Sequence, residues 1–216
     1  FIELGGKKIL AQTTDMTNYQ DTIDMYKYLN SKFPESIDLA LGIHPTRIEE
    51  GISKNNLDNV DIFQYTKKQY EIFEEVLNRN IKDVTAIGEC GLDYFSMNNY
   101  FDFTDEKKDQ LKEAQRLLFS KLCKLAVKYN LPMSIHARDI DGSSNCVKDA
   151  LEIIAKEGKG TIKGSFHSYT GDIEMLDKIL SLGMYVGFNA IITYPSGENV
   201  RKILKEVPVE RVLFET

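Results

Sequence analysis

Short apolar runs alternate with longer amphipathic stretches along nearly the whole chain, and this alternation constrains the fold more than any other feature. The runs are rich in Ile, Val, Leu or Phe, as in strands that are covered on both faces of a parallel sheet. They are Lys7–Thr14, Ile37–Ile43, Val84–Gly88, Met133–Ile135, Thr161–Phe166, Met184–Phe188 and Arg211–Phe214.

The stretches between these runs carry apolar residues at helical spacing. Asp172 is suited to cap one of these helices, and Ser196 could cap a last helix that stops before Pro208. The other predicted helices are Asp21–Leu29, Ile62–Leu77, Lys108–Tyr129 and Val147–Lys156, and the helix that Asp172 opens runs to Leu182.

The regular exchange of strand and helix predicts a parallel α/β protein. A doubly wound sheet often carries a Gly-rich phosphate loop after its first strand, and this sequence has neither G-x-G-x-x-G nor G-x-x-x-x-G-K-[ST]. We therefore favour a TIM-type (β/α)8 barrel, which usually needs roughly 250 residues. Because the chain has 216 residues and stops just after its last strand, we expect one domain, 1–216, truncated at both ends.

Charge and cysteine content narrow the functional classes. The net charge of -6 argues against a protein that binds nucleic acid through a broad basic face, although a bound metal ion could still supply local positive charge. Cys90, Cys123 and Cys146 are widely spaced and suggest free thiols in a reducing compartment, so we expect a cytoplasmic or nuclear location. No apolar run is long enough to span a membrane, no protein partner is predicted, and the oligomeric state is left open.

All three histidines of the chain, His44, His136 and His167, follow apolar runs. In a (β/α)8 barrel the carboxyl ends of the strands form the active-site face, so we expect these side chains to converge. A lone histidine at a strand end is more often a structural residue, and His44, which precedes Pro45, could serve only to order a turn.

Glu89 closes the run Val84–Gly88, and burying its carboxylate is costly unless it is paired or binds a metal. Gly88 and Gly91 would let the backbone bend and approach a ligand, whereas a Gly-rich turn with solvated acids is the alternative. Glu89, His136 and His167 match the ligand set of a catalytic metal that generates hydroxide from water. The metal could be Zn, Mg or Mn.

Arg138 and Glu215 are two further candidates. Arg138 would share a strand face with His136 if the strand runs that far, and its guanidinium suits phosphate oxygens. An ion pair with Asp139 or Asp141 is the alternative. Glu215 follows the last apolar run and could be a base, an acid behind the ligands, or a frayed terminal residue.

Five motifs occur together in a fixed order, and their combination resembles the TatD family of metal-dependent deoxyribonucleases, within the amidohydrolase-like barrels. His44-Pro45-Thr46-Arg47 and the cysteine of the second motif resemble the eukaryotic branch. The motifs are Gly42-Ile43-His44-Pro45, Ala86-Ile87-Gly88-Glu89-Cys90-Gly91-Leu92-Asp93-Tyr94, Leu131-Pro132-Met133-Ser134-Ile135-His136-Ala137-Arg138, Phe166-His167-Ser168-Tyr169 and Leu213-Phe214-Glu215-Thr216.

The resemblance implies cleavage of DNA phosphodiester bonds, as a 3′ exonuclease, with divalent metals. It implies that Glu89 bridges metals, that His136 and His167 bind them, and that Glu215 belongs to an E-T-D motif. It places His44 and Arg138 near the substrate phosphate, and we assign catalytic roles to Glu89, Arg138 and Glu215. The family usually begins with a strand that ends in H-x-H, and this sequence has no H-x-H, so the resemblance implies that this strand is either absent or lost upstream of Phe1. The aspartate of E-T-D would follow Thr216.

Two other functions stay open. One is a different hydrolase on the same scaffold, such as a lactonase, amidase or deaminase. Such sites often use a carboxylated lysine at a strand end, and no lysine closes an apolar run here. The other is a barrel without metal that acts as a scaffold.

Overall fold

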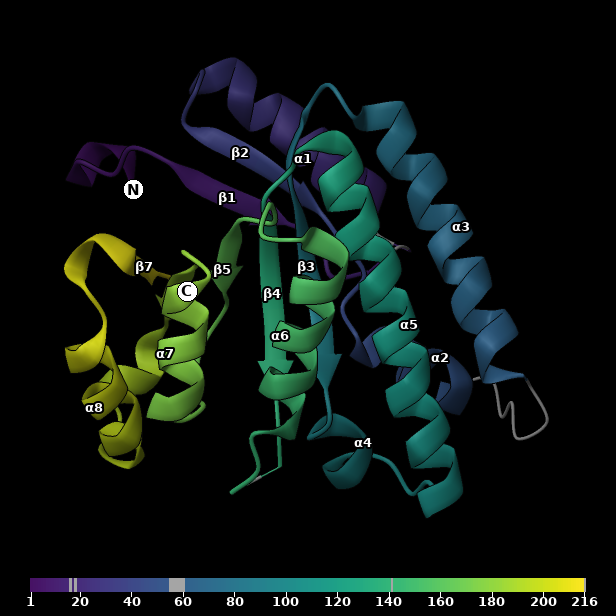
Figure 1. The fold of residues 1–216 in the computed structure, drawn as a ribbon. Coiled ribbons are helices and arrows are strands. Elements are labelled where there is room, and N and C mark those ends of the chain that lie inside the picture. The colour runs from purple at the N-terminus through teal and green to yellow at the C-terminus, as the bar shows by residue number, and fades with distance from the viewer. Residues whose placement is uncertain (16, 18, 55–60, 141, 216) are drawn as a thin grey trace.

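The computed structural model describes residues 1–15, 17, 19–54, 61–140 and 142–215. In this part of the chain, seven parallel strands form one sheet in which the spatial order follows the order of the chain (Figure 1). They are β1 Ile9–Gln12, β2 Ile37–Leu41, β3 Val84–Asp93, β4 Met133–Arg138, β5 Gly164–Phe166, β6 Tyr185–Phe188 and β7 Val212–Phe214. The sheet curls into an open barrel, which confirms the predicted α/β, TIM-type class.

Helices connect successive strands and cover the outside of the curled sheet (Figure 1). The long helix α5 packs against β3 and between α3 and α6. The α-helices are α1 Tyr19–Lys32, α2 Thr46–Lys54, α3 Ile62–Asn80, α4 Ser96–Asn99, α5 Asp105–Tyr129, α6 Asn145–Gly158, α7 Ile173–Ser181 and α8 Glu198–Glu206.

Polar side chains and left-handed residues set several helix boundaries. Asp61 accepts hydrogen bonds from the backbone of Phe63 and Gln64 and caps α3. Asn130 adopts a left-handed conformation (φ 52°) and ends α5, as the Asn-Leu-Pro sequence predicts. Asp172 caps α7 through the amide of Met175, which confirms its predicted role.

Some predicted boundaries are wrong. Strands β3 and β4 continue past Gly88 and Ile135, because the strands keep pairing along Gly91↔His136 and Asp93↔Arg138. Glu89 therefore lies within a strand and does not close one. Ser196 does not cap the last helix, which begins at Glu198 and has no side-chain cap. The short helices α2 and α4 were not predicted.

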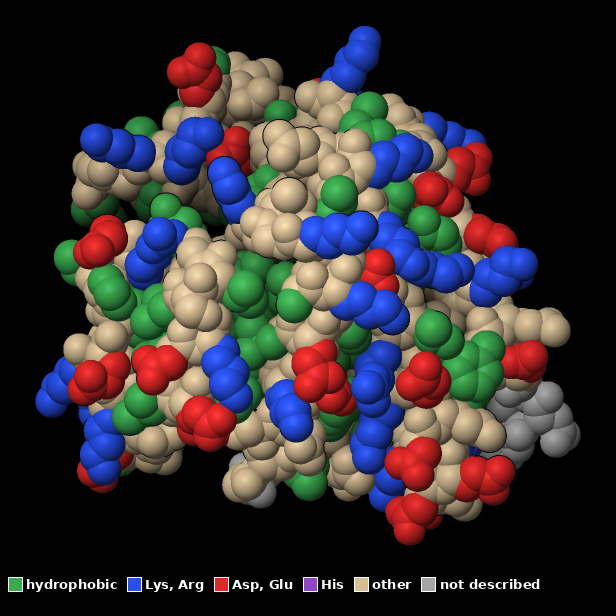
Figure 2. Space-filling view, viewed as in Figure 1, with side chains coloured by type: hydrophobic (Ala, Val, Ile, Leu, Met, Phe, Trp, Pro, Cys, Tyr) green, Lys and Arg blue, Asp and Glu red, His purple; other side chains and the backbone are tan. Residues whose placement is uncertain are grey.

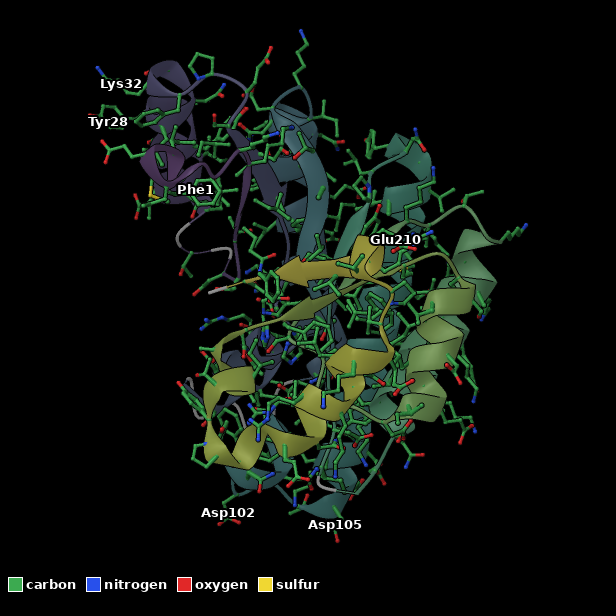
Figure 3. The ribbon with its side chains drawn as sticks, turned by 90° about the vertical axis from the view of Figure 1, so that its left-hand side faces the viewer. Phe1, Tyr28, Lys32, Asp102, Asp105 and Glu210 are labelled. Atoms are coloured by element: carbon green, nitrogen blue, oxygen red, sulfur yellow. The ribbon has the colours of Figure 1, made fainter. Side chains whose placement is uncertain are left out.

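The barrel is open on one side. Among the described strands, β1 pairs with β2 alone and β7 with β6 alone, so two strand edges remain unpaired. Figure 3 looks onto this side, with the N-terminal segment around Phe1 above and the C-terminal strand below. A groove of about 720 Å³ separates them; Leu10 and Phe214 lie on its two walls, and Glu89 and His167 line it as well. Solvent therefore reaches the inner face of the sheet.

Charges of both signs are interspersed over the helical face shown in Figure 2, and the described residues form no single basic surface there. Cys90, Cys123 and Cys146 are free thiols, as predicted, and all three are buried. None of the described helices combines the length and the apolarity that a bilayer crossing needs.

Candidate metal centre

Two glycines allow the strands that carry the site to approach closely. A Cβ atom on Gly42 would lie 2.4 Å from the carbonyl carbon of Gly88, and one on Gly91 would lie 1.9 Å from the carbonyl oxygen of His136. Gly91 also has φ +146°, which L side chains rarely adopt. At these two positions glycine lets β3 pass close to its neighbours beside Glu89.

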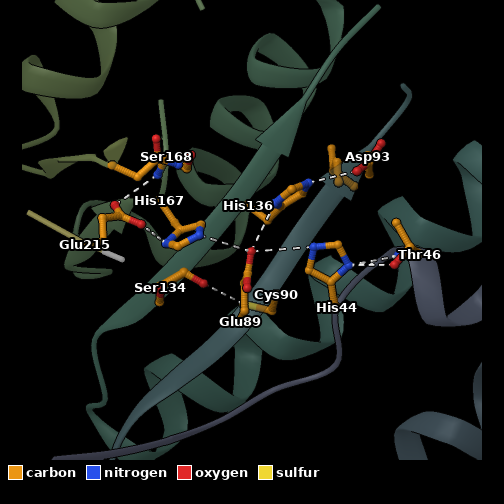
Figure 4. A network of polar contacts seen from close by, with 12 residues as sticks. His44, Thr46, Glu89, Cys90, Asp93, Ser134, His136, His167, Ser168 and Glu215 are labelled. Carbon is orange, nitrogen blue, oxygen red and sulfur yellow. Dashed lines mark hydrogen bonds and ion pairs between the residues drawn. The ribbon is translucent and has the colours of Figure 1, made fainter. Parts of the chain in front are cut away.

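The carboxylate of Glu89 lies among the three imidazoles of the chain (Figure 4). Its Oε1 atom is 3.0 Å from His136 Nδ1, 3.5 Å from His44 Nε2 and 3.7 Å from His167 Nε2. Burial by itself would raise the pKa of Glu89, but hydrogen bonds from His136 and His44 hold it well below the usual range. Glu89 is therefore an anion at neutral pH.

His136 lies between two carboxylates. Its Nδ1 faces Glu89, and its Nε2 lies 2.9 Å from Oδ2 of Asp93, which is almost fully buried. Burial would lower the pKa of His136, yet Asp93 and Glu89 raise it to about 9. A carboxylate that accepts from one ring nitrogen leaves the other oriented as a ligand.

His167 follows β5 and pairs with Glu215, which follows β7. The His167 Nδ1 atom contacts Glu215 Oε2, and the amide of Ser168 donates to Glu215 Oε1 at 3.0 Å. Burial by itself would lower the pKa of His167, but the hydrogen bond with Glu215 raises it above the ordinary value of an imidazole. Glu215 thus lies behind His167 as Asp93 lies behind His136.

His44 lies in the turn between β2 and α2. Its Nδ1 is 2.8 Å from Oγ1 of Thr46, and its Nε2 points toward Glu89. Burial lowers the pKa of His44, so the ring is neutral at pH 7, and a proton on Nδ1 would leave Nε2 free to bind a cation. The ring lies edge-on to His136, with centroids 4.3 Å apart.

The side chains fit a divalent cation. His44, Glu89 and His136 each offer one ligand atom, and these atoms all lie within 4.8 Å of one another. Two imidazoles and one carboxylate form a known ligand set of catalytic zinc. From the sequence, His44 was assigned to substrate binding and His167 to metal binding. The structure brings both imidazoles beside Glu89, and His44 belongs to the group of three potential ligands with Glu89 and His136. The role of each histidine stays a prediction.

Arg138 lies at the end of β4, two residues beyond His136 on the same strand. Its guanidinium carbon is 3.8 Å from the ring centroid of Phe95, and no acid among the described residues forms an ion pair with it. The proposed alternative partner Asp139 instead accepts from the amide of Cys146 and the hydroxyl of Ser143, while Asp141 lies outside the described residues. Among the described residues, the Arg138 guanidinium thus contacts the rings of Phe95 and Tyr100 and pairs with no acid.

Sequence reasoning missed part of the site. Asp93 was noted only for its spacing from Glu89, and the contact with His136 depends on β3 continuing to Asp93. Glu49 and Gln115, which lie behind Asp93, were not singled out. Gln115 could have been found from the sequence, because it is a polar residue on the apolar face of the predicted helix Lys108–Tyr129.

A curled parallel sheet with one carboxylate and several imidazoles near the carboxyl ends of its strands defines a metal-dependent hydrolase of the (β/α) barrel class. Comparison with known proteins agrees. Residues 1–216 match the family described as TatD related DNase, and the chain belongs to that family.

Relatives extend this finding. The chain is 27% identical to an uncharacterized metal-dependent hydrolase of Buchnera aphidicola, over 97% of this chain and 67% of that protein. It is 32% identical to a TATDN1 homolog of Enterocytozoon bieneusi, provisionally named a deoxyribonuclease, over 81% of this chain and 53% of that protein. The crystal structure of YjjV, a TatD homolog from Escherichia coli, superposes with a TM-score of 0.68 at 23% identity, covering 97% of this chain and 66% of that one. The chain thus spans about two thirds of these proteins or less.

Proposed function

We propose that the protein hydrolyses phosphodiester bonds of DNA with the help of a divalent cation. One observation carries the proposal: a single carboxylate oxygen, Oε1 of Glu89, has an imidazole nitrogen from each of three separate segments within 3.7 Å. Buried ionisable groups that converge from distant strands are typical of functional sites. The family match supports a metal-dependent hydrolase, and the choice of DNA as the substrate is what we propose beyond it.

Glu89, His136 and either His44 or His167 would hold the cation. When bound, a divalent cation lowers the pKa of a water molecule and offsets negative charge on a phosphoryl group. Asp93 and Glu215 orient the imidazoles of His136 and His167 through their other ring nitrogens.

Arg138 would bind the substrate phosphate. Its guanidinium is fixed against Phe95 and has no described acid as a partner, so its N–H groups can donate to two phosphate oxygens. Because the chain carries a net charge of -6, the Arg138 guanidinium and the bound metal would supply local positive charge for an anionic substrate.

Metal-dependent cleavage of DNA tests the proposal. A labelled single-stranded oligonucleotide is incubated with the protein and Zn²⁺, Mg²⁺ or Mn²⁺, with a chelator as the control. We expect cleavage that the chelator abolishes and that Glu89→Gln reduces by at least about 100-fold, because the ligand charge is lost. The matched control is Glu157→Gln, a carboxylate that pairs with Lys124 and Ser120 away from the site. Equal cleavage by wild type and Glu89→Gln would contradict the proposal.

A substrate panel separates the competing activities. The protein is offered the oligonucleotide, bis(p-nitrophenyl) phosphate, a lactone and an aryl amide under the same metal conditions. Turnover of the lactone or the amide, with neither phosphodiester cleaved, would favour another amidohydrolase-type reaction. Failure to bind any divalent ion would favour a scaffold.

A further inference from the structure

Gln115 places an uncharged polar group in the apolar face of α5. The residue is fully buried, and its neighbours on that face, Leu111, Ala114 and Leu118, pack into the core. A buried amide is costly unless its donors and acceptor are satisfied, so its hydrogen bonds indicate what it does.

The Gln115 amide satisfies the backbone of Asp93 where the sheet has no strand to do so. Strand β2 pairs with β3 only as far as Leu41↔Ile87, whereas β3 runs on to Asp93. Beyond that pairing, the amide of Asp93 donates to Gln115 Oε1 at 2.8 Å, and Gln115 Nε2 donates to the carbonyl oxygen of Asp93 at 3.2 Å. Gln115 therefore takes the place of a neighbouring strand at this one residue.

Glu49 fixes the Gln115 amide from the other side. It lies on α2, is fully buried, and accepts a hydrogen bond from Gln115 Nε2 at 2.6 Å. Burial raises the pKa of Glu49 to about 8, so the carboxyl group is neutral at pH 7 and adds no charge near Asp93. The amide of Asp93, which can only donate, settles which end of the Gln115 side chain carries oxygen.

The same helix supports a second imidazole of the site. Thr46, at the start of α2, lies 2.8 Å from His44 Nδ1 through its hydroxyl, and Glu49 lies one turn further on. Hydrogen bonds thus run from Gln115 to α2, which carries Thr46, and to Asp93, which holds His136 Nε2. The imidazoles of His136 and His44, whose other nitrogens face Glu89, are thus linked to Gln115 by hydrogen bonds and by the helix α2.

We propose that Gln115 and Glu49 are positioning residues that hold Asp93 and α2 so that His136 and His44 meet a cation at Glu89. This inference rests on the proposed metal site. Neither residue touches the cation or the substrate; both act through side chains that do. Supporting groups of this kind typically change metal affinity about 10–100-fold when removed.

The test compares Zn²⁺ affinity with stability in matched variants. Gln115→Met keeps the length of the side chain and removes its hydrogen bonds, while Leu118→Ala removes core packing from the same helix. Zn²⁺ affinity is measured by competition with a chromophoric chelator, and stability by denaturant unfolding. We expect Gln115→Met to weaken Zn²⁺ binding at least about tenfold. We expect Leu118→Ala to lower stability with Zn²⁺ affinity within about twofold of wild type, since it lies outside the network.

Variants of Glu49 give a second test that does not depend on Gln115→Met folding. Glu49→Gln keeps an acceptor for Gln115, and Glu49→Leu removes it. We expect Glu49→Gln to bind Zn²⁺ like wild type and Glu49→Leu to bind it several-fold more weakly. Zn²⁺ affinity that is unchanged in both Gln115→Met and Glu49→Leu would overturn the proposal.

A readout on the metal-free protein separates this inference from the proposed function. The ring nitrogens of His136 are followed by ¹⁵N NMR in wild type and in Gln115→Met, without added metal. We expect the His136 signals to shift in Gln115→Met, because Asp93 loses its fixed position. In the control variant Leu118→Ala, the His136 signals should stay where they are in wild type. If wild type binds no Zn²⁺, the proposed function fails, and unshifted His136 signals in Gln115→Met would then overturn the positioning role as well.

Discussion

His136 Nε2 lies 2.9 Å from Oδ2 of Asp93, and this contact fixes which nitrogen of the ring faces Glu89. The Asp93 carboxylate is itself held, since its Oδ1 accepts from the amide of Ser96 at 2.7 Å. The Asp93 carboxylate therefore holds one nitrogen of the His136 ring, and the other nitrogen faces the proposed metal position. Proteins use such a carboxylate to orient a metal-binding histidine and to raise its basicity.

Asp93→Asn is expected to weaken divalent metal binding by about 10–100-fold, because an amide supports the imidazole less well than a carboxylate does. Zn²⁺ competition titrations would measure the change. Asp149→Asn is the control, since Asp149 pairs with Tyr94 and Arg116 and has no contact with the imidazoles. Equal losses in both variants would mean that a general charge effect, and not the contact with His136, sets the affinity.

The sequence predicted the elements well and their ends less well. Apolar runs located all seven strands, because strands buried on both faces need continuous hydrophobic sequence. The extensions of β3 and β4 contain Glu89, Gly91, Asp93 and His136, which have no apolar pattern. Their strand geometry comes from pairing across the sheet, which a local pattern does not reveal.

The candidate site was predictable in its members but not in its contacts. The positions of Glu89, His136 and His167 beside apolar runs indicated that they would converge, and they do. The nearness of His44 to Glu89 depends on the turn into α2, a helix too polar to stand out in the sequence. Gln115 and Glu49 become meaningful only once α2 and α5 lie against the end of β3.

Metal binding should depend steeply on pH. The pKa of His136 is raised to about 9, so below that pH a proton occupies the nitrogen that would bind the cation. The cation must displace this proton, and its apparent affinity should rise about tenfold per pH unit from pH 7 to 9 and then level off. Affinity measured in buffers from pH 6.5 to 9.5 tests this expectation, and a flat profile would show that His136 is not a ligand.

Glu49→Gln should stabilise the protein at alkaline pH. The pKa of Glu49 is raised by burial from 4.5 to about 8 in the folded state. Its contribution to stability is therefore complete below pH 4.5 and is lost as the pH rises toward 8. Glutamine does not ionise, so Glu49→Gln keeps the stability that wild type loses as the pH rises. The free energy of unfolding of the variant should therefore exceed that of wild type by at most about 4 kcal/mol at pH 8, and by little at pH 5.

The difference between the two proteins is the quantity to compare, because His136 adds a similar loss to both. The pKa of His136 is about 9 in the folded protein, above its ordinary value of 6.5, so the stabilising effect of its charge fades between those two pH values. Denaturant unfolding of wild type and Glu49→Gln at pH 5 and pH 8 makes the measurement. A constant difference at both values would mean that Glu49 is charged in the folded protein.

Gly91→Ala should be strongly destabilising. A Cβ at this position would lie 1.9 Å from the carbonyl oxygen of His136, and the backbone has φ +146°. We expect a loss above about 3 kcal/mol, or failure to fold. Gly183→Ala is the matched control, since φ is +72° there with nothing within 4 Å of the added carbon, and it should cost about 1 kcal/mol. Thermal unfolding of both variants measures the contrast, and equal losses would contradict the steric argument.

Arg138→Lys should separate phosphate recognition from metal binding. The guanidinium carbon of Arg138 lies 3.8 Å from the Phe95 ring centroid, and lysine would keep the charge but lose this stacking and the two parallel donors. We expect KM for a phosphodiester substrate to rise about tenfold, since a bidentate charged contact contributes about 1.5–3 kcal/mol. Zn²⁺ affinity should stay within about twofold of wild type, because Arg138 offers the cation no ligand atom.

Steady-state kinetics and the chelator titration measure KM and Zn²⁺ affinity of Arg138→Lys on the same preparation. Arg116→Lys, which alters an arginine paired with Asp149 on the helical surface, serves as the control. A weakened Zn²⁺ affinity with KM unchanged would place Arg138 in the support of the metal site and remove it from the binding of phosphate.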